Sequence, residues 1–149
     1  MSVKSARGVN LEQGEAISLL DVTNAGDTVG TNGTAVYVQG ERLVYTWLLN
    51  VTSAAAAAGD TLDVYVDTNV NDTWINVAHF TQVLGNGGAK KYFTVTIPTN
   101  MTTTDSATTD CAVGVARGVV GSQFRGRYVI VDGGAHGEEF SFTVVGYAL

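Results

Sequence analysis

Side chains that could bind a transition metal are scattered along the chain. His79, Cys111 and His136 are its only histidine and cysteine residues, and they stand in three separate segments. A structural zinc site needs such ligands in closely spaced pairs, and no such pair occurs here. The sequence therefore predicts no metal centre and no other cofactor, and we interpret Cys111 as a small apolar core residue.

A second pattern, D-x-N-x-N over Asp67–Asn71, begins like a calcium-binding loop. The EF-hand version of that loop requires glycine at its sixth position and glutamate at its twelfth. Asp72 and Ala78 occupy these two positions. Because asparagine and aspartate also favour turns, we interpret this segment as a polar hairpin turn.

Residue types suited to acid–base or nucleophilic catalysis occur near the C-terminus, but they form no known motif. Ser122, Asp132 and His136 would supply a nucleophile, a carboxylate and a base. No G-x-S-x-G turn or comparable pattern accompanies them. Glu138 and Glu139 are adjacent, so in a strand they point to opposite faces and cannot act together. We predict that the protein is not an enzyme.

Arg125 and Arg127 carry the most specific chemistry in the chain. They are two residues apart, so in a strand both side chains lie on one face. Two neighbouring guanidiniums are suited to holding carboxylates of a partner protein. The alternative is that they pair with local Asp or Glu residues on a solvated face. Both interpretations remain open from the sequence.

The elements that position these residues are predicted to be strands. Val, Ile, Thr, Tyr and Phe alternate with polar residues, and Gly, Asn and Asp separate the alternating runs. Arg42–Val51 is nearly all apolar, which is typical of a central strand. The expected strands are about Glu15–Val22, Thr34–Val38, Arg42–Val51, Thr61–Asp67, Asp72–Phe80 with a continuation over Thr81–Leu84, Lys91–Ile97, Cys111–Ala116, Phe124–Asp132 and Glu138–Leu149.

The connections between these strands indicate one compact all-β domain. Ser53–Asp60 is rich in alanine but too short for a stable helix, so we expect a loop or a single turn. We expect Thr68–Asn71 to form a hairpin loop, Thr99–Asp110 a long surface loop, and the last two strands a hairpin. The predicted fold is an antiparallel β-sandwich or jelly roll of about eight strands over Glu15–Leu149. An up-and-down barrel is the main rival.

Composition and charge exclude several classes of partner. The net charge is −6 and the pI about 4.6, which argues against binding to nucleic acid or to an anionic membrane surface. The single cysteine fits synthesis in a reducing cytoplasm. The N-terminal residues show no secretion signal, and no run of apolar residues is long enough to span a membrane.

Three stretches of the sequence resemble small jelly-roll decoration proteins of tailed bacteriophage capsids, which are also called cement or head auxiliary proteins. RLVYTWLLNVTSAAAAAGDTLDV is similar to their strand, small-residue loop and strand. TLDVYVDTNVNDTWINVAHFTQ resembles a recurring β-hairpin, and FRGRYVIVDGGAHGEEFSFTVVGYAL resembles their C-terminal hairpin. The resemblance covers about Arg42–Leu149, with Cys111–Gly121 less distinctive.

This resemblance implies a virion structural protein. Such a protein would be made in the host cytoplasm and would bind the major capsid protein on the outer capsid surface. It would assemble as a homotrimer and stabilise the shell. The resemblance supplies no catalytic residue. We expect an N-terminal arm, Met1–Gly14, to contact a neighbouring subunit through Lys4 and Arg7, and the Thr99–Asp110 loop to lie at a contact.

Other functions remain as alternatives. The same domain type is expected in phage tails or fibres, or as a carbohydrate-binding module. A carbohydrate site would need exposed aromatic side chains, and Tyr37, Trp47 and Trp74 are the candidates. The alternation around Trp74 favours a packed position in the core. A metalloenzyme of the cupin type would need more clustered histidines than the two present.

Overall fold

The computed structural model describes residues 9–10, 16–26, 28–39, 44–57, 59–85, 91–98, 121–133 and 139–148. These residues form eleven β-strands and no helix. Within this part of the chain there is accordingly no helix with the length and hydropathy of a membrane span. The all-β prediction is confirmed.

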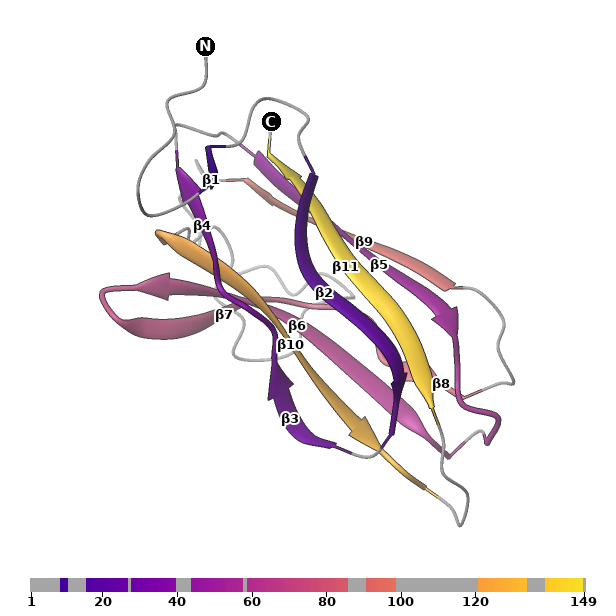
Figure 1. Ribbon diagram of the computed structural model, residues 1–149. Helices are drawn as coiled ribbons and strands as arrows, with labels where there is room; N and C mark the ends of the chain where they lie inside the picture. Colours follow the sequence, from indigo (N-terminus) through magenta and orange to yellow (C-terminus); the bar gives the residue numbers. More distant parts are fainter. Residues whose placement is uncertain are drawn as a thin grey trace.

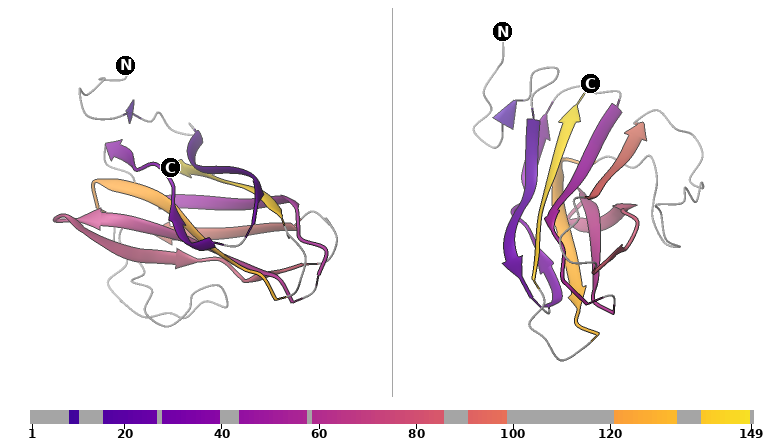
Figure 2. Two further views of the ribbon diagram at one scale, coloured as in Figure 1. Left: turned by 60° about the horizontal axis from the view of Figure 1, so that its bottom comes forward. Right: turned by 90° about the vertical axis from the view of Figure 1, so that its right-hand side faces the viewer.

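The strands form two sheets that pack face to face as a β-sandwich, and Figure 2 shows the two layers. One sheet has the order β1-β4-β10-β6-β7, with β3 also paired to β10 and β8 to β6. The other has the order β2-β11-β5-β9. The strand bounds are β1 Val9–Asn10, β2 Ala16–Ala25, β3 Thr28–Asn32, β4 Val36–Gln39, β5 Val44–Ser53, β6 Thr61–Val70, β7 Thr73–His79, β8 Val83–Leu84, β9 Lys91–Pro98, β10 Gln123–Val131 and β11 Phe140–Ala148.

The strand order is that of a jelly roll. β1 and β8 have two residues each, and β3 and β4 lie one after the other along β10 as one interrupted strand. Setting the short strands aside and counting β3 and β4 together leaves eight strands in the described residues. Numbered along the chain, they run 1-8-3-6 in one sheet and 2-7-4-5 in the other. The chain thus passes between layers repeatedly, as in a double Greek key.

Alternating burial produces the core between the sheets. In β10, every second residue from Phe124 to Ile130 is buried, and the residues between them are half-buried on the outer face. Aromatic rings join the layers: Phe124 packs 5.0 Å from Tyr45 and 5.1 Å from Trp47, both on β5. Ring pairs at such distances add to the stabilisation that burial of their area already gives.

Glycine allows close packing at two positions, between the two layers at Gly126 and between neighbouring strands of one sheet at Gly146. A Cβ atom on Gly126 would lie 2.4 Å from Cγ of Leu20 in the opposite sheet. One on Gly146 would lie 2.1 Å from the ring of Trp47, which is fully buried. The interior faces of β10 and β11 therefore have bare backbone where a large side chain packs on them.

Most predicted strands are confirmed within a few residues. β5 lies between β11 and β9, so the prediction of a central strand for Arg42–Val51 is correct. Ser53–Asp60 contains no helix in its described residues. The short strand β3 was not predicted, and Thr34–Val38 corresponds to β4.

The hairpin loop predicted at Thr68–Asn71 is wrong in its bounds. β6 continues to Val70, and the turn consists of Asn71 and Asp72 alone. Both have positive φ, 50° and 60°, as a two-residue type I′ turn requires. Apart from glycine, asparagine and aspartate tolerate this backbone better than other residues, which explains the short turn.

The C-terminal hairpin is also wrong. β10 pairs with β3, β4 and β6, whereas β11 pairs with β2 and β5 in the other sheet (Figure 1). Alternation predicts that each strand has a buried face, but it does not say which layer the strand joins. The continuation predicted at Thr81–Leu84 is a separate short strand, β8, which pairs with β6.

Several predictions fall outside the described residues. These are the strand at Cys111–Ala116, the loop at Thr99–Asp110 and most of the arm Met1–Gly14. Within the arm, Val9 and Asn10 form β1, which runs parallel to the end of β4.

Candidate functional site

The outer face of the β10-β6-β7 sheet carries a continuous row of interacting polar and aromatic side chains. Figure 1 shows these three strands side by side in one layer. β6 contributes Asp63, Tyr65 and Asp67, which alternate with the buried residues of that strand, and β10 contributes Arg125 and Arg127. We call this row, together with the residues of β7 described next, the arginine–aromatic face.

A β-bulge in β7 places residues of that strand on the same face. Val66 pairs with Ala78, but the next residue, Asp67, pairs with Asn76, so Val77 is an extra residue. The extra residue shifts the alternation by one position. Trp74 and Asn76 before the bulge and His79 after it therefore all lie on the outer face.

The two arginines of β10 share one carboxylate oxygen. Nε of Arg125 donates to Oδ2 of Asp67 over 3.2 Å, and Nε of Arg127 donates to the same oxygen over 3.3 Å. The Asp67 side chain is only 4% exposed, against 19% for Arg125 and 28% for Arg127. The aspartate is thus shielded from water, which strengthens its attraction to both guanidiniums.

Each guanidinium lies over an aromatic ring. The Cζ atom of Arg125 is 4.2 Å from the centre of the Trp74 ring, and that of Arg127 is 4.0 Å from the Tyr65 ring. Both distances are well within the range of cation–π contacts. The rings and Asp67 together fix the position of both arginine side chains.

The row continues from Tyr65 along β7. The His79 ring stacks on Tyr65 with 4.3 Å between ring centres, and its Nε2 lies 2.9 Å from Oδ1 of Asp63. Gln82 donates to the other oxygen of Asp63 over 2.8 Å. The hydrogen bond from His79 holds the pKa of Asp63 below its usual value, although burial acts in the opposite direction. Burial raises the pKa of Tyr65.

Two oxygen atoms within this face are buried and have no hydrogen-bond partner among the described residues. They are Oδ1 of Asp67 and Oδ1 of Asn76, and these two residues are direct cross-strand partners in β6 and β7. A carboxylate oxygen in this position is stabilised by the neighbouring positive charges rather than by a donor of its own.

The outer face of the other sheet differs sharply in chemistry. Among the described residues on it, Asp21 of β2 is the only one with a charge. The face has exposed tyrosines at its two ends, Tyr147 with 42% and Tyr92 with 59% exposure. Between them lie small polar and aliphatic side chains: Ser18, Thr46, Leu48, Asn50, Thr94, Thr143 and Val145. We call this surface the uncharged face.

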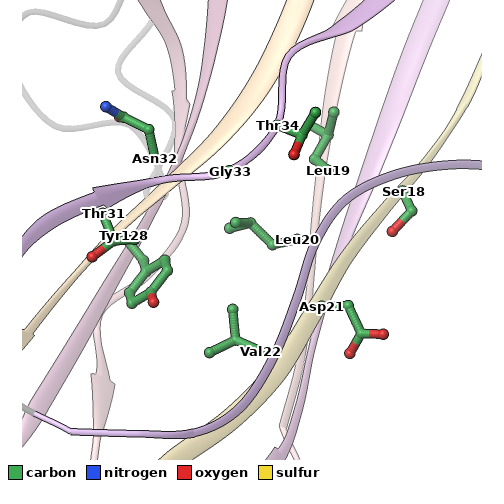
Figure 3. A pocket seen from close by; sticks show the side chains of 10 residues that line it. All are labelled: Ser18, Leu19, Leu20, Asp21, Val22, Thr31, Asn32, Gly33, Thr34 and Tyr128. Carbon is green, nitrogen blue, oxygen red and sulfur yellow. The ribbon is translucent and has the colours of Figure 1, made fainter.

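A hollow of about 370 Å³ opens between β2 and β3, at the side of the sandwich where both sheets end. Figure 3 shows Leu20 and Val22 pointing from β2 toward Tyr128, whereas Ser18 and Asp21 point away from that gap. Of the residues that line the hollow, Asp21 has the only carboxylate and none is His, Cys or Lys. Asp21 and Tyr128 are the only titratable side chains among these lining residues.

The predicted site residues fall into two groups. Arg125 and Arg127 lie together on one face as expected, and the local partner anticipated for them is Asp67. Lys4 and Arg7 lie outside the described residues. Cys111, His136 and Glu138 also lie outside them, so the catalytic combination with Ser122 cannot be assembled from the described residues.

The aromatic residues proposed for a carbohydrate site are placed differently from one another. Trp47 is fully buried in the core, and Tyr37 is 40% exposed. The prediction that Trp74 packs in the core is wrong, because Trp74 is half-buried on the outer face beneath Arg125. The prediction of a strand around Trp74 was correct, but the prediction that Trp74 lies on the core face of that strand was not.

The sequence patterns did not indicate which residues would contact the two arginines. Asp67 was interpreted as the end of a strand and the start of a turn, and Tyr65 and His79 were interpreted as strand residues. One signal was present: in TLDVYVD the polar positions Asp63, Tyr65 and Asp67 share one face opposite the apolar ones. What no pattern indicated was the antiparallel register that sets Arg125 opposite Asp67.

Comparison with protein-family models gives no match for this chain, and comparison with curated proteins gives none either. Among the described residues, no three His, Cys, Asp or Glu side chains gather into a group that could hold a metal ion. The chemistry of the two outer faces is therefore the best guide to what this protein binds.

Proposed function

We propose that this protein is a virion structural protein that decorates the outer surface of a phage capsid. In this role it binds the major capsid protein, associates with itself as a homotrimer, and stabilises the shell without catalysing a reaction. Two lines of support combine here. One is the resemblance of Arg42–Leu149 to capsid decoration proteins, and the other is the chemistry of the uncharged face.

The uncharged face is the observation that carries the proposal. A solvated sheet face in a soluble protein normally has charged side chains across it, whereas the described residues of this face include a single carboxylate, on the edge strand. Depletion of charge and enrichment of tyrosine are what distinguish the centres of protein–protein interfaces. A face with Tyr92 and Tyr147 around Leu48 and Val145 therefore supports contact with another protein.

Repetition makes modest contacts sufficient for this role. A capsid offers many identical sites, and a trimer engages several of them at once, so each single contact can be weak. A carbohydrate platform has less support, because Trp47 is buried and the ring of Trp74 is covered by Arg125.

The proposal is tested in two steps. Light scattering on the purified protein over a concentration series should give a mass three times the 15.6 kDa of one chain. Co-sedimentation with capsids of the encoding virus that lack this protein should then recover it in the capsid fraction. A monomer at every concentration contradicts the trimer, and absence from the capsid pellet contradicts decoration.

A substitution on the uncharged face tests whether this face makes the proposed contact. Leu48→Lys places a charge at the centre of the uncharged face, where Leu48 is half-buried and paired with Val145 and Thr94. It should reduce trimer formation or capsid binding at least ten-fold, because the partner would have to desolvate the ammonium group. Thr73→Lys on β7 is the matched control, since Thr73 is exposed at the far end of the other sheet.

A further inference from the structure

The two arginines on β10 retain most of their hydrogen-bonding capacity. A guanidinium has five N–H donors, and the contacts to Asp67 use only the Nε donor of each arginine. Neither side chain makes another hydrogen bond to the described residues. Within the described part of the chain, no acceptor therefore occupies the Nη donors of either guanidinium, and these donors can bind a carboxylate through two parallel bonds.

These donors are held in place before any partner arrives. Arg125 is fixed between Asp67 and the Trp74 ring, and Arg127 between Asp67 and the Tyr65 ring. A free arginine side chain loses substantial conformational entropy when a partner immobilises it. Here that loss has already occurred on folding, so a bound carboxylate gains more net free energy.

Charge determines the partner. The two guanidiniums and the Asp67 carboxylate together carry one net positive charge, and the other carboxylate of this face, Asp63, is hydrogen-bonded to His79 and Gln82. The chain as a whole has a net charge of −6. A single carboxylate complements this charge. A polyanion such as nucleic acid would be repelled by the rest of the molecule. Because Asp67 is nearly fully buried beneath the arginines, it does not compete for the Nη donors from outside.

We propose that Arg125 and Arg127 form a receptor for an Asp or Glu side chain of the capsid protein. This inference depends on the proposed function and adds a second contact to it: the uncharged face contributes apolar area, and the arginine–aromatic face fixes the orientation through one charged anchor. Arginine, tryptophan and tyrosine are the residues most often found at the energetic centres of interfaces, and all three occur here.

The test compares two variants that change the net charge equally. Arg127→Gln removes one receptor guanidinium and leaves the Arg125–Asp67 pair in place. Lys91→Gln removes a positive charge from a lysine whose ammonium group binds the backbone oxygen of Leu84. In co-sedimentation with capsids that lack the protein, Arg127→Gln should bind at least ten-fold more weakly, and Lys91→Gln within two-fold of the unsubstituted protein.

A third variant tests whether binding needs the planar guanidinium group of Arg127 or only its positive charge. Arg127→Lys keeps the positive charge but loses the two parallel donors and the stacking on Tyr65, so it should also lose most of the binding. Near-ultraviolet circular dichroism confirms that each variant is folded. Full binding by Arg127→Gln or by Arg127→Lys would overturn the receptor proposal and leave capsid decoration intact.

The receptor can also be tested without a capsid. Sodium acetate added to ¹⁵N-labelled protein should shift the Nε–Hε resonances of Arg125 and Arg127 saturably, whereas sodium chloride at equal ionic strength should not. The other arginines of the chain serve as internal controls. If acetate shifts all arginines alike, or chloride has the same effect, the receptor is refuted. If the unsubstituted protein does not bind capsids but acetate still shifts the Arg125 and Arg127 resonances saturably, the proposed function fails and the carboxylate site stands.

Discussion

At the scale of single residues, Asp67 determines whether the arginine–aromatic face can exist. It is the only carboxylate that contacts Arg125 and Arg127 in the described residues, and it is almost completely buried. Without it, two guanidiniums would stand side by side with no compensating charge. A partly buried cluster of this kind is sensitive to loss of one partner because the remaining charges stay desolvated.

Asp67→Asn is therefore expected to destabilise the fold by about 2 kcal/mol, since it removes the charge but keeps the shape. Urea denaturation followed by circular dichroism measures the change. Asp72→Asn in the adjacent turn is the control, because Asp72 is exposed and asparagine suits its positive φ. A loss no larger than that of the control would mean that the ion pairs contribute little.

The hydrogen bond between Asp63 and His79 predicts a response to acid. Because the pKa of Asp63 is lowered in the folded protein, Asp63 stays ionised there at pH values where it is already protonated in the unfolded chain. This contribution to stability is therefore present above the ordinary pKa of 3.8 and is lost as the pH falls through the lowered value.

His79→Phe should raise the pKa of Asp63, because it removes the hydrogen bond and leaves the burial. Titration of the Asp63 carboxyl carbon by NMR gives the pKa directly in both proteins. The stability difference between them should shrink as the pH is lowered below 3.8. An Asp63 pKa that is the same in the variant would show that Gln82 alone accounts for the shift.

At the scale of elements, close approach between strands depends on glycine where a large ring packs. Gly146→Ala would force a methyl group against Trp47, and overpacking of this kind costs about 1–3 kcal/mol. Thermal and urea unfolding should show this loss. Gly59→Ala is the matched control, since a Cβ there would have its nearest neighbour at 3.5 Å, an ordinary contact. Equal stability of the two variants would contradict the close packing at Gly146.

The β6–β7 turn makes a second prediction at this scale. Asp72→Val should destabilise the protein by about 1–2 kcal/mol, because a β-branched residue is poorly tolerated at positive φ. Asp72→Gly should be neutral or slightly stabilising, as glycine adopts this conformation without strain. Thermal unfolding of the two variants distinguishes a backbone effect from loss of the carboxylate, since both substitutions remove it.

At the scale of the whole molecule, the two sheets share one core and should unfold together. Phe124 of one layer contacts Tyr45 and Trp47 of the other, and β10 also packs on β2. In Trp74→Phe, the remaining tryptophan reports on the β2-β11-β5-β9 sheet, while far-ultraviolet circular dichroism reports on both. Coincident urea transitions are expected for a two-state domain. Separate midpoints would mean that the layers are independent units.

The sequence predicted the class of fold well because alternation is a local signal. The strands β2, β5, β6 and β10 each have an apolar side that the residue pattern shows directly. The assignment of strands to layers is not local, which is why β10 and β11 were paired wrongly. The face of Trp74 was missed for a related reason, since neither its side of the sheet nor the bulge at Val77 has a clear sequence pattern.

The candidate site was predictable only in part. The spacing of Arg125 and Arg127 predicts a shared face in any strand. Arg125 and Arg127 are 58 and 60 residues from Asp67 in the chain. Their contact with Asp67 depends on β10 pairing with β6 in one of several possible registers. Such a contact follows from the folded topology, and a single sequence does not reveal it.

The tripeptide Arg125-Gly126-Arg127 also constrains how this chain can change over evolutionary time. Its two arginines lie on the outer face of the sandwich, while the glycine between them lies on the inner face and packs against Leu20. A deletion or insertion of one residue that shifts this part of β10 in register would turn both guanidiniums into the core and bring Gly126 to the surface. The length of this strand should accordingly be inherited almost without variation, even in descendants whose loops have grown or shrunk freely.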